Sequence, residues 1–255
     1  MGLLAVAPLA WAAASQPVAA QAQGVNGYEL PSAALQAVVD APRAPSLFLS
    51  PRRDLAVQMG TPSLPSIAQV AQPELKLAGL RIHPRTYSES RFSFGNSLVL
   101  KSVADASERP IKGLPQDLAV ASLAWSHDQR FLAFNHIDAA NGGNELWLVD
   151  IGSASARRLL GGLNTVLDDG YQWLPDSSGL LVQLQPEGRT PPPESTVPTG
   201  PAIQQTGATG EVRAIRTYQD LLANENDAAR FDHYATVQPA LVSLGGQVQH
   251  IAQPG

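Results

Sequence analysis

A strand–turn–strand pattern that recurs beside a tryptophan constrains the fold of this chain more than any other feature. The two clear copies span 124–134 and 172–182, and Trp125 and Trp173 are 48 residues apart. Each Trp is followed three residues later by an Asp, which can hydrogen-bond the backbone of a tight turn. A weaker copy spans 48–57. This repeat is typical of the blades of a β-propeller.

Further strand candidates extend each repeat to four strands. They are 97–101 and 109–111 for the first repeat, 144–150 and 156–160 for the second, and 240–244 and 247–251 for the third. Turn-forming residues join the last two strands of a repeat, as expected for hairpins. The sequence therefore predicts an all-β fold, a partial propeller of about three four-stranded blades. Their expected bounds are about 45–113, 118–162 and 170–253.

Two long insertions interrupt the first and third blades, at about 60–96 and 186–236. The second insertion begins with three prolines at 191–193 and is expected to be extended there. It then carries a helix that we predict from Tyr218 to about Tyr234. The candidate buried positions of this helix are Leu221, Leu222, Ala229 and Phe231.

Three blades do not close a propeller, because closure takes at least four. An open set exposes a strand edge and the apolar face of a blade. We therefore interpret residues 45–255 as an incomplete propeller and the chain as a piece of a longer protein.

The N-terminus is typical of an exported protein. An apolar run at 3–14 precedes the small-x-small site Ala20-Gln21-Ala22 and is too short to span a bilayer. No Lys or Arg precedes the run, so a buried N-terminal helix is the alternative interpretation. We predict a signal peptide over 1–22, cleaved after Ala22, and a periplasmic or secreted mature chain without a membrane span.

The mature chain then begins with an extension at 23–44. Apolar residues at helical spacing predict a short helix between Pro31 and Pro42. These residues are Leu30, Leu35, Val38 and Val39.

Composition excludes several classes of function. The net charge is -5 with 15% charged residues and no basic cluster, which argues against nucleic-acid binding. Cysteine is absent, so neither disulfides nor thiolate metal sites can form. The five histidines lack metal-ligand spacing; they are His83, His127, His136, His233 and His250. We expect no cofactor and no metal, and an exposed turn position for His127.

Three other motifs have both a functional and a structural interpretation. Residues 168–170 (Asp-Asp-Gly) suggest a cation loop, but the alternating carboxylates of a calcium site are missing, so a turn is favoured. The Gly-rich 141–144 lacks the Lys and helix of a phosphate loop and is expected to be a hairpin turn. Trp125, Trp147 and Trp173 are expected in the core rather than on a stacking platform.

No catalytic residue is predicted. A serine hydrolase of the α/β type carries Gly-x-Ser-x-Gly between a strand and a helix, and this pentapeptide does not occur in the chain. The serines of the repeats lie in turn contexts, as Ser177 and Ser178 do.

Three arginines in or near the first insertion are candidate substrate contacts: Arg81, Arg85 and Arg91. An Arg can hold a carboxylate through two parallel hydrogen bonds, which suits an enzyme that selects acidic side chains. The alternative, which we favour, is a solvated loop with structural ion pairs.

The sequence also resembles a known family in segments that include both insertions. The matching segments are 28–31, 64–68, 72–82, 84–86, 125–128, 145–147, 198–201 and 216–222. They make the chain similar to the N-terminal half of prolyl-oligopeptidase-family serine peptidases, in the bacterial branch that resembles glutamyl endopeptidases.

The resemblance implies a large enzyme in which a propeller covers a C-terminal α/β-hydrolase domain. It implies that the Ser, Asp and His of the triad lie in the hydrolase domain, and that the propeller limits which peptides reach them. The leading hypothesis is thus a non-catalytic propeller segment of an exported serine peptidase, whose partners are peptide substrates handled by the missing domain. The alternatives are a non-enzymatic TolB-like periplasmic propeller that binds a protein, and a truncated gene remnant.

Overall fold

The computed structural model describes residues 30–41, 43–90, 94–193 and 220–255. Two units are distinguished, Met1–Ala41 and Pro42–Gly255. In the first, the described element is α1 (Ala33–Val39), whose N-cap Ser32 accepts a hydrogen bond from the Leu35 amide. No residue of α1 is buried. Of the helices that the structure describes, none combines the length and the apolar character needed to cross a bilayer.

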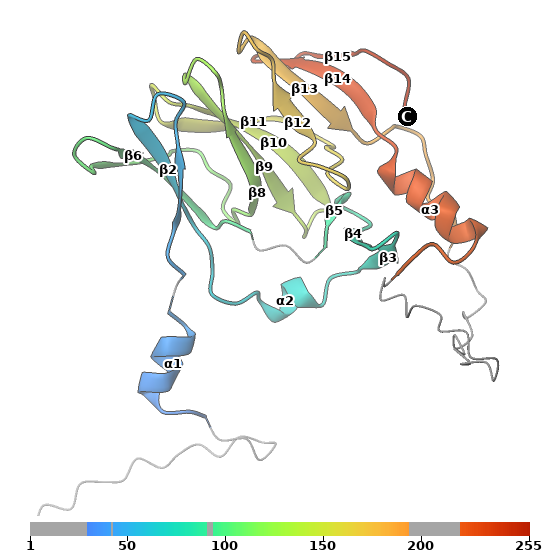
Figure 1. Ribbon diagram of the computed structural model, residues 1–255, viewed down its shortest axis with the longest axis horizontal. Coiled ribbons are helices and arrows are strands. Elements are labelled where there is room, and N and C mark those ends of the chain that lie inside the picture. Colours follow the sequence, from blue (N-terminus) through green and yellow to red (C-terminus); the bar gives the residue numbers. More distant parts are fainter. Residues whose placement is uncertain (1–29, 42, 91–93, 194–219) are drawn as a thin grey trace, which may run out of the picture. The chain divides into compact units, whose positions relative to one another are not determined.

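Three antiparallel four-stranded sheets form most of the second unit (Figure 1). Blade 1 contains β1 (Ser46–Leu49), β2 (Leu55–Gly60), β6 (Ser97–Ser102) and β7 (Glu108–Pro110). Blade 2 contains β8 (Val120–Trp125), β9 (Phe131–Asp138), β10 (Gly143–Asp150) and β11 (Ser155–Gly161). Blade 3 contains β12 (Tyr171–Trp173), β13 (Gly179–Leu184), β14 (Gln238–Ser243) and β15 (Val248–His250). Neighbours in each sheet follow chain order, so the predicted partial propeller of about three four-stranded blades is confirmed.

Alternating side chains at the start of the middle strand β9 enter different cores, because successive residues of a strand point to opposite faces. In β9, Leu132 and Phe134 belong to a core shared with blade 1, whereas Ala133 belongs to a core shared with blade 3. All three are fully buried. Trp125 and Trp147 pack against the first core and Trp173 lies in the second, so the tryptophans have the packing role expected of them.

The three repeat turns have the same backbone geometry. They run Ser50–Leu55, Ser126–Phe131 and Leu174–Gly179, and in each the first amide donates to the last carbonyl over 2.8–3.0 Å. The fourth turn residue is left-handed in every copy, with φ of 61° at Arg53, 64° at Gln129 and 60° at Ser177.

The aspartates of the repeat stabilise their own turns, as predicted. Asp128 accepts a hydrogen bond from the Arg130 amide and Asp176 accepts one from the Ser178 amide, both over 3.0 Å. These bonds favour the ionised carboxylate and help to hold the pKa of both aspartates below its usual value, against the opposing effect of desolvation.

The first insertion contains structure that the sequence did not predict. Helix α2 (Ile67–Val70) has a reciprocal capping box between Ser66 and Gln69. A three-stranded antiparallel sheet follows, formed by β3 (Leu75–Leu77), β4 (Leu80–His83) and β5 (Ser88–Glu89). Both residues of the tight turn between β3 and β4 are left-handed, Ala78 with φ of 52° and Gly79 with φ of 81°.

The helix of the second insertion is shorter than predicted. Helix α3 spans Glu225–Ala235, and its N-cap Asn224 accepts a hydrogen bond from the Asp227 amide. The prediction that it begins near Tyr218 was wrong over the described residues from Asp220 to Asn224, because Asp220 has φ of 57° and the cap lies at Asn224. Residues 218 and 219 lie outside the described residues.

The predicted buried face of this helix was also mostly wrong. Leu221 and Leu222 precede α3 and are exposed, and Ala229 is exposed on it. Phe231 packs partly against a core, but the buried residues of α3 are His233 and Tyr234.

Candidate functional site

The two insertions come together in one body, although they are far apart in the sequence. We call this body the insertion module; it comprises β3–β5, Asp220 and α3. Arg81 on β4 forms ion pairs with Glu74 at 2.7 Å and with Asp220 at 2.9 Å. The Asp220 carbonyl also accepts a hydrogen bond from the Gly79 amide over 3.1 Å. The first insertion thus holds Asp220 of the second insertion by an ion pair and by a backbone hydrogen bond.

Aromatic side chains form the centre of the insertion module. The hydroxyl of Tyr87 lies 2.8 Å from Nε2 of His233, and the rings of Tyr87 and Tyr234 are 5.1 Å apart. His233 and Tyr234 are buried, and Tyr234 shares a core with Leu77 and Ile82. Burial lowers the pKa of His233 and raises that of Tyr87, so both groups are held neutral near neutral pH.

The connection between blades 2 and 3 ties the module to the propeller. The Thr165 amide donates to the Tyr87 carbonyl over 2.8 Å, and its hydroxyl accepts a hydrogen bond from Asn144 of β10 over 2.8 Å. The side-chain Nδ2 of Asn164 donates to the Tyr234 carbonyl over 2.8 Å and to the Thr236 carbonyl over 3.0 Å. Since Asn164 is buried, these bonds satisfy polar atoms that water does not reach.

A cavity of about 370 Å³ lies between the module, blade 2 and this connection. Its wall includes Arg81 and Glu89 of the module, Asn135 of β9, and Asp168 and Asp169 of the connection. Leu80, Ile82, Phe94, Val166 and Leu167 supply apolar surface.

The charge of the cavity wall is predominantly negative. Arg81 is already paired with two carboxylates, whereas Glu89, Asp168 and Asp169 all line the cavity. Asp168 is fixed in place, because it accepts hydrogen bonds from the Gly170 amide over 2.7 Å and from the Gln183 side chain over 2.8 Å. Such a wall favours a basic group over an acidic one. Residues 168–170 also form the expected turn, in which Gly170 has φ of 72°.

The structure separates the candidate arginines. Arg81 lines the cavity but is held by Glu74 and Asp220. Arg85 is exposed and donates to the Ala140 carbonyl over 3.2 Å, in the β9–β10 hairpin turn. This turn spans 139–142 and so lies two residues earlier than the predicted 141–144, because β10 already begins at Gly143. Arg91 lies outside the described residues. Arg81 lines the cavity and Arg85 does not, so the two arginines do not face one common site.

Three histidines have buried structural positions that the sequence did not reveal. Nδ1 of His83 accepts hydrogen bonds from the Arg85 and Thr86 amides, and Nδ1 of His136 accepts one from the Ala119 amide. His127 is exposed in its turn. Within the described ranges, no His ring is hydrogen-bonded to a Ser or Thr hydroxyl, and no three acidic or His side chains form a metal-binding group. The partners of His83 are local, two and three residues away, whereas those of His136 and His233 come from the tertiary fold, 17 and 146 residues away.

Comparison with curated sequences identifies relatives of this chain. The chain is 35% identical over 240 residues to a probable chloroplastic glutamyl endopeptidase of Oryza sativa subsp. japonica, covering 89% of this chain and 25% of the relative. It is 36% identical over 240 residues to the corresponding protein of Arabidopsis thaliana, covering 90% and 25%. The chain is a relative of the glutamyl endopeptidases. The resemblance inferred from the sequence is thereby confirmed, and the chain spans about a quarter of the length of these relatives.

The solved structures that resemble this chain have low sequence identity to it. The β-propeller domain of the Trilobed protease from Pyrococcus furiosus is 10% identical, with 84% of this chain and 44% of that chain covered and a TM-score of 0.38. An acylaminoacyl peptidase from Pyrococcus horikoshii is 11% identical, with 83% and 25% covered and a TM-score of 0.39. No family model matches the chain.

Proposed function

We propose that this chain is the non-catalytic propeller portion of an exported serine peptidase. The observation that carries the proposal is the 35% identity over 240 residues to a glutamyl endopeptidase, in a chain folded as propeller blades. Peptide hydrolysis is then the task of an α/β-hydrolase domain outside this sequence. The lack of Gly-x-Ser-x-Gly in the chain supports the assignment of catalysis to another domain.

In this proposal the propeller controls access to the hydrolase domain. Loops at the mouth of a scaffold commonly carry such roles, because they vary without disturbing the sheets. The insertion module and its cavity are the part of this chain that a plain strand–turn–strand repeat does not require. The three carboxylates of the cavity suit a basic group of a passing peptide. The contact of Arg81, Arg85 and Arg91 with acidic side chains stays a prediction, and exposure favours Arg85 over Arg81.

The gene beyond codon 255 gives the first test. An open frame with further strand–turn–strand units, then Gly-x-Ser-x-Gly and later an Asp and a His, supports the proposal. A frame that completes a propeller and then stops supports the TolB-like alternative, and an immediate stop supports a gene remnant.

The purified chain gives the second test. A fluorophosphonate probe, which labels activated serines, should leave the chain unlabelled and label the product of the longer frame. Labelling of the 255-residue chain would overturn the proposal. Control of access predicts that the longer product cleaves short peptides but not folded or unfolded proteins; equal rates on a ten-residue peptide and on casein would argue against it.

Export has its own test. The mature protein should be recovered from the periplasm or the medium with Gln23 as its first residue, because the small-x-small site ends at Ala22. A cytoplasmic protein that retains residues 1–22 would contradict this part of the proposal.

A further inference from the structure

The cavity of about 370 Å³ has an inner end and a mouth that differ in character. Ile82 and Asn135 line it although each is only 1% exposed, so they form its inner end. Glu89, Asp168 and Asp169 line it and are exposed, so they lie at its mouth. A ligand that enters therefore meets carboxylates first and buried groups last.

The wall of the cavity does not neutralise the carboxylates at the mouth. Within the described residues, Arg81 is the one cation that lines the cavity, and both Glu74 and Asp220 pair with it. Over the same ranges, the carboxylates of Glu89 and Asp169 take part in no hydrogen bond and no ion pair. Two negative charges at the mouth are thus left for a cation from outside, which such a wall attracts.

The inner end of the cavity carries a hydrogen-bond donor that the chain uses only in part. Oδ1 of Asn135 accepts hydrogen bonds from the amide and the hydroxyl of Ser122, over 2.7 and 2.9 Å, which fixes the side chain. The Nδ2 group has two N–H donors. In the described part of the chain its contact is with Oδ1 of Asn144, at 3.5 Å. One buried N–H is therefore left for an acceptor in the cavity, such as the carbonyl of a peptide bond.

Apolar side chains supply the remaining wall: Leu80, Ile82, Phe94, Val166 and Leu167. A bulky apolar group that leaves water for such a wall is stabilised by about 25 cal/mol for each Å² that it buries. The volume of the cavity lies at the lower end of the range for small-ligand pockets, about 300–1,000 Å³. The cavity consequently has room for one bulky side chain and part of its backbone.

We propose that this cavity binds a peptide through one bulky apolar side chain that is next to a Lys or Arg. The apolar side chain packs on Leu80 and Val166, and a backbone carbonyl accepts a hydrogen bond from Nδ2 of Asn135. The basic side chain stays at the mouth beside Glu89 and Asp169, where an acidic side chain is repelled. This inference rests on the proposed function, because it names the peptides that the cavity takes, but it requires no hydrolysis.

The probe for the cavity is the capped peptide acetyl-Ala-Leu-Arg-Ala-amide, which has no charged terminus. Titrated into the isotope-labelled 255-residue chain, it should give saturable NMR shifts at the Nδ2 group of Asn135, the Asp169 amide and the Val166 methyls. Glu in place of the Arg of the peptide should weaken binding about tenfold, because attraction at the mouth becomes repulsion. Ser in place of its Leu should also weaken binding about tenfold, because the buried apolar side chain is lost.

Charge variants of the chain test the mouth. Glu89→Gln and Asp169→Asn each remove one charge, and neither breaks a hydrogen bond of the described chain. Each should weaken binding of the Arg peptide about threefold, in the range of exposed ion pairs. The effect should disappear at about 1 M salt, where charges are screened. Glu187→Gln is the matched control, because Glu187 is an exposed carboxylate outside the cavity, and it should leave binding unchanged.

A second pair of variants tests the apolar wall. Leu167 lines the cavity and is 59% exposed, so Leu167→Ser should leave the fold intact and weaken binding about threefold. Leu64 is 60% exposed and lies outside the cavity, so Leu64→Ser should leave binding unchanged.

Three outcomes would overturn the proposal. They are the absence of saturable shifts at Asn135 and Asp169, equal affinity for the Arg and Glu peptides, and binding that requires an uncapped amino terminus. Each of them leaves the proposed function standing, because that function is judged by fluorophosphonate labelling of the longer product. If the longer product stays unlabelled while the chain binds the Arg peptide, the proposed function fails and the assignment of the cavity stands.

Discussion

Tyr87 and His233 lie 146 residues apart in the sequence, yet their side chains are joined by a hydrogen bond of 2.8 Å. Tyr87 comes from the first insertion and His233 from the second. Because His233 is buried, this bond fixes how two interruptions of different blades meet. Substitution of either residue is therefore a direct test of how the insertion module is held together.

Removal of the Tyr87 hydroxyl should weaken the chain. Tyr87→Phe leaves a buried nitrogen of His233 without its partner, so we expect the free energy of unfolding to fall by about 1–2 kcal/mol. Urea denaturation followed by circular dichroism measures the change. Tyr171→Phe is the control, because the Tyr171 hydroxyl has only longer contacts, at 3.3 and 3.4 Å. A larger loss in Tyr171→Phe than in Tyr87→Phe would contradict the assignment.

Stability should decrease as the pH falls below about 6.5. The pKa values of His83, His136 and His233 are all lowered, chiefly by burial. The unfolded chain, with His pKa values of about 6.5, then binds protons before the folded chain does. The stabilisation is fully present above the unfolded-state pKa of about 6.5 and is lost as the pH falls through the lowered pKa values of the folded chain. Urea midpoints at several pH values measure the slope.

Single substitutions assign this pH dependence. His136→Asn should flatten the slope, because it removes one of the three buried groups. His127→Asn, in an exposed turn, should leave the slope as it is. An equal effect of the two substitutions would be evidence against a role of burial.

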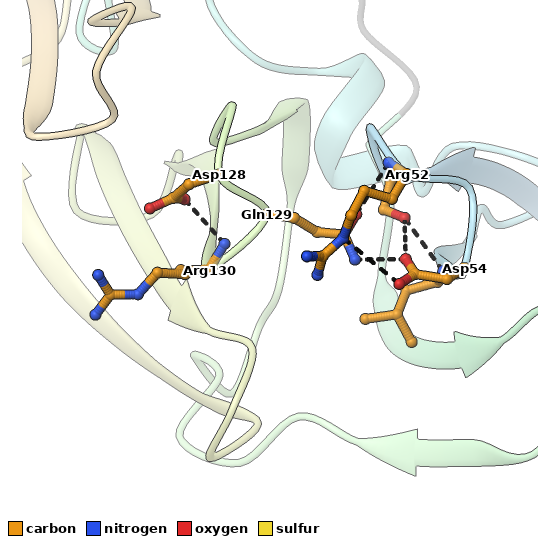
Figure 2. Close-up of polar contacts among 7 residues, drawn as sticks. Arg52, Asp54, Asp128, Gln129 and Arg130 are labelled. Atoms are coloured by element: carbon orange, nitrogen blue, oxygen red, sulfur yellow. Dashed lines mark hydrogen bonds and ion pairs between the residues drawn. The ribbon is translucent and has the colours of Figure 1, made fainter.

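Loss of the Gln129 side chain should loosen the contact between blades 1 and 2. Gln129 accepts from the Arg52 amide and donates to Asp54, and its side-chain bonds are drawn in Figure 2. Gln129→Ala removes both hydrogen bonds. The backbone at this position stays left-handed, and both Gln and Ala carry a Cβ there, so the substitution tests the side-chain bonds. We expect a loss of about 2 kcal/mol in the free energy of unfolding. Gln58→Ala, whose side chain has a single contact at 3.5 Å to Lys101, should cost less.

Loss of Arg81 should separate the two insertions. Arg81→Ala leaves Glu74 and Asp220 without their shared cation, and we expect a cost of about 2 kcal/mol, between the values for exposed and buried ion pairs. Limited proteolysis should then cut faster near Asp220. Arg85→Ala removes one exposed hydrogen bond and should leave the cutting rate unchanged. Equal protection of both variants would show that Arg81 does not hold the second insertion.

The sequence predicted the blades well because their signals are local. The apolar run that begins β9 and the Asp of the two clear turns depend on neighbours within a few residues. The insertion module was not predicted, since its determinants are contacts such as Arg81 with Asp220. The error over Leu221 and Leu222 has a local origin instead. Helical spacing suggested a buried face, but the left-handed Asp220 and the Asn224 cap start the helix after both leucines.

The packing of β9 has a consequence for how this chain can change over generations. Leu132 and Phe134 fill one core and Ala133 fills another, so no residue of this run faces water. A larger side chain at Ala133 pushes against blade 3, and a smaller one at Phe134 opens a void beside blade 1. Mutational drift should therefore be slowest in the middle strands of blade 2, and the outer strands and insertions should absorb most of the variation.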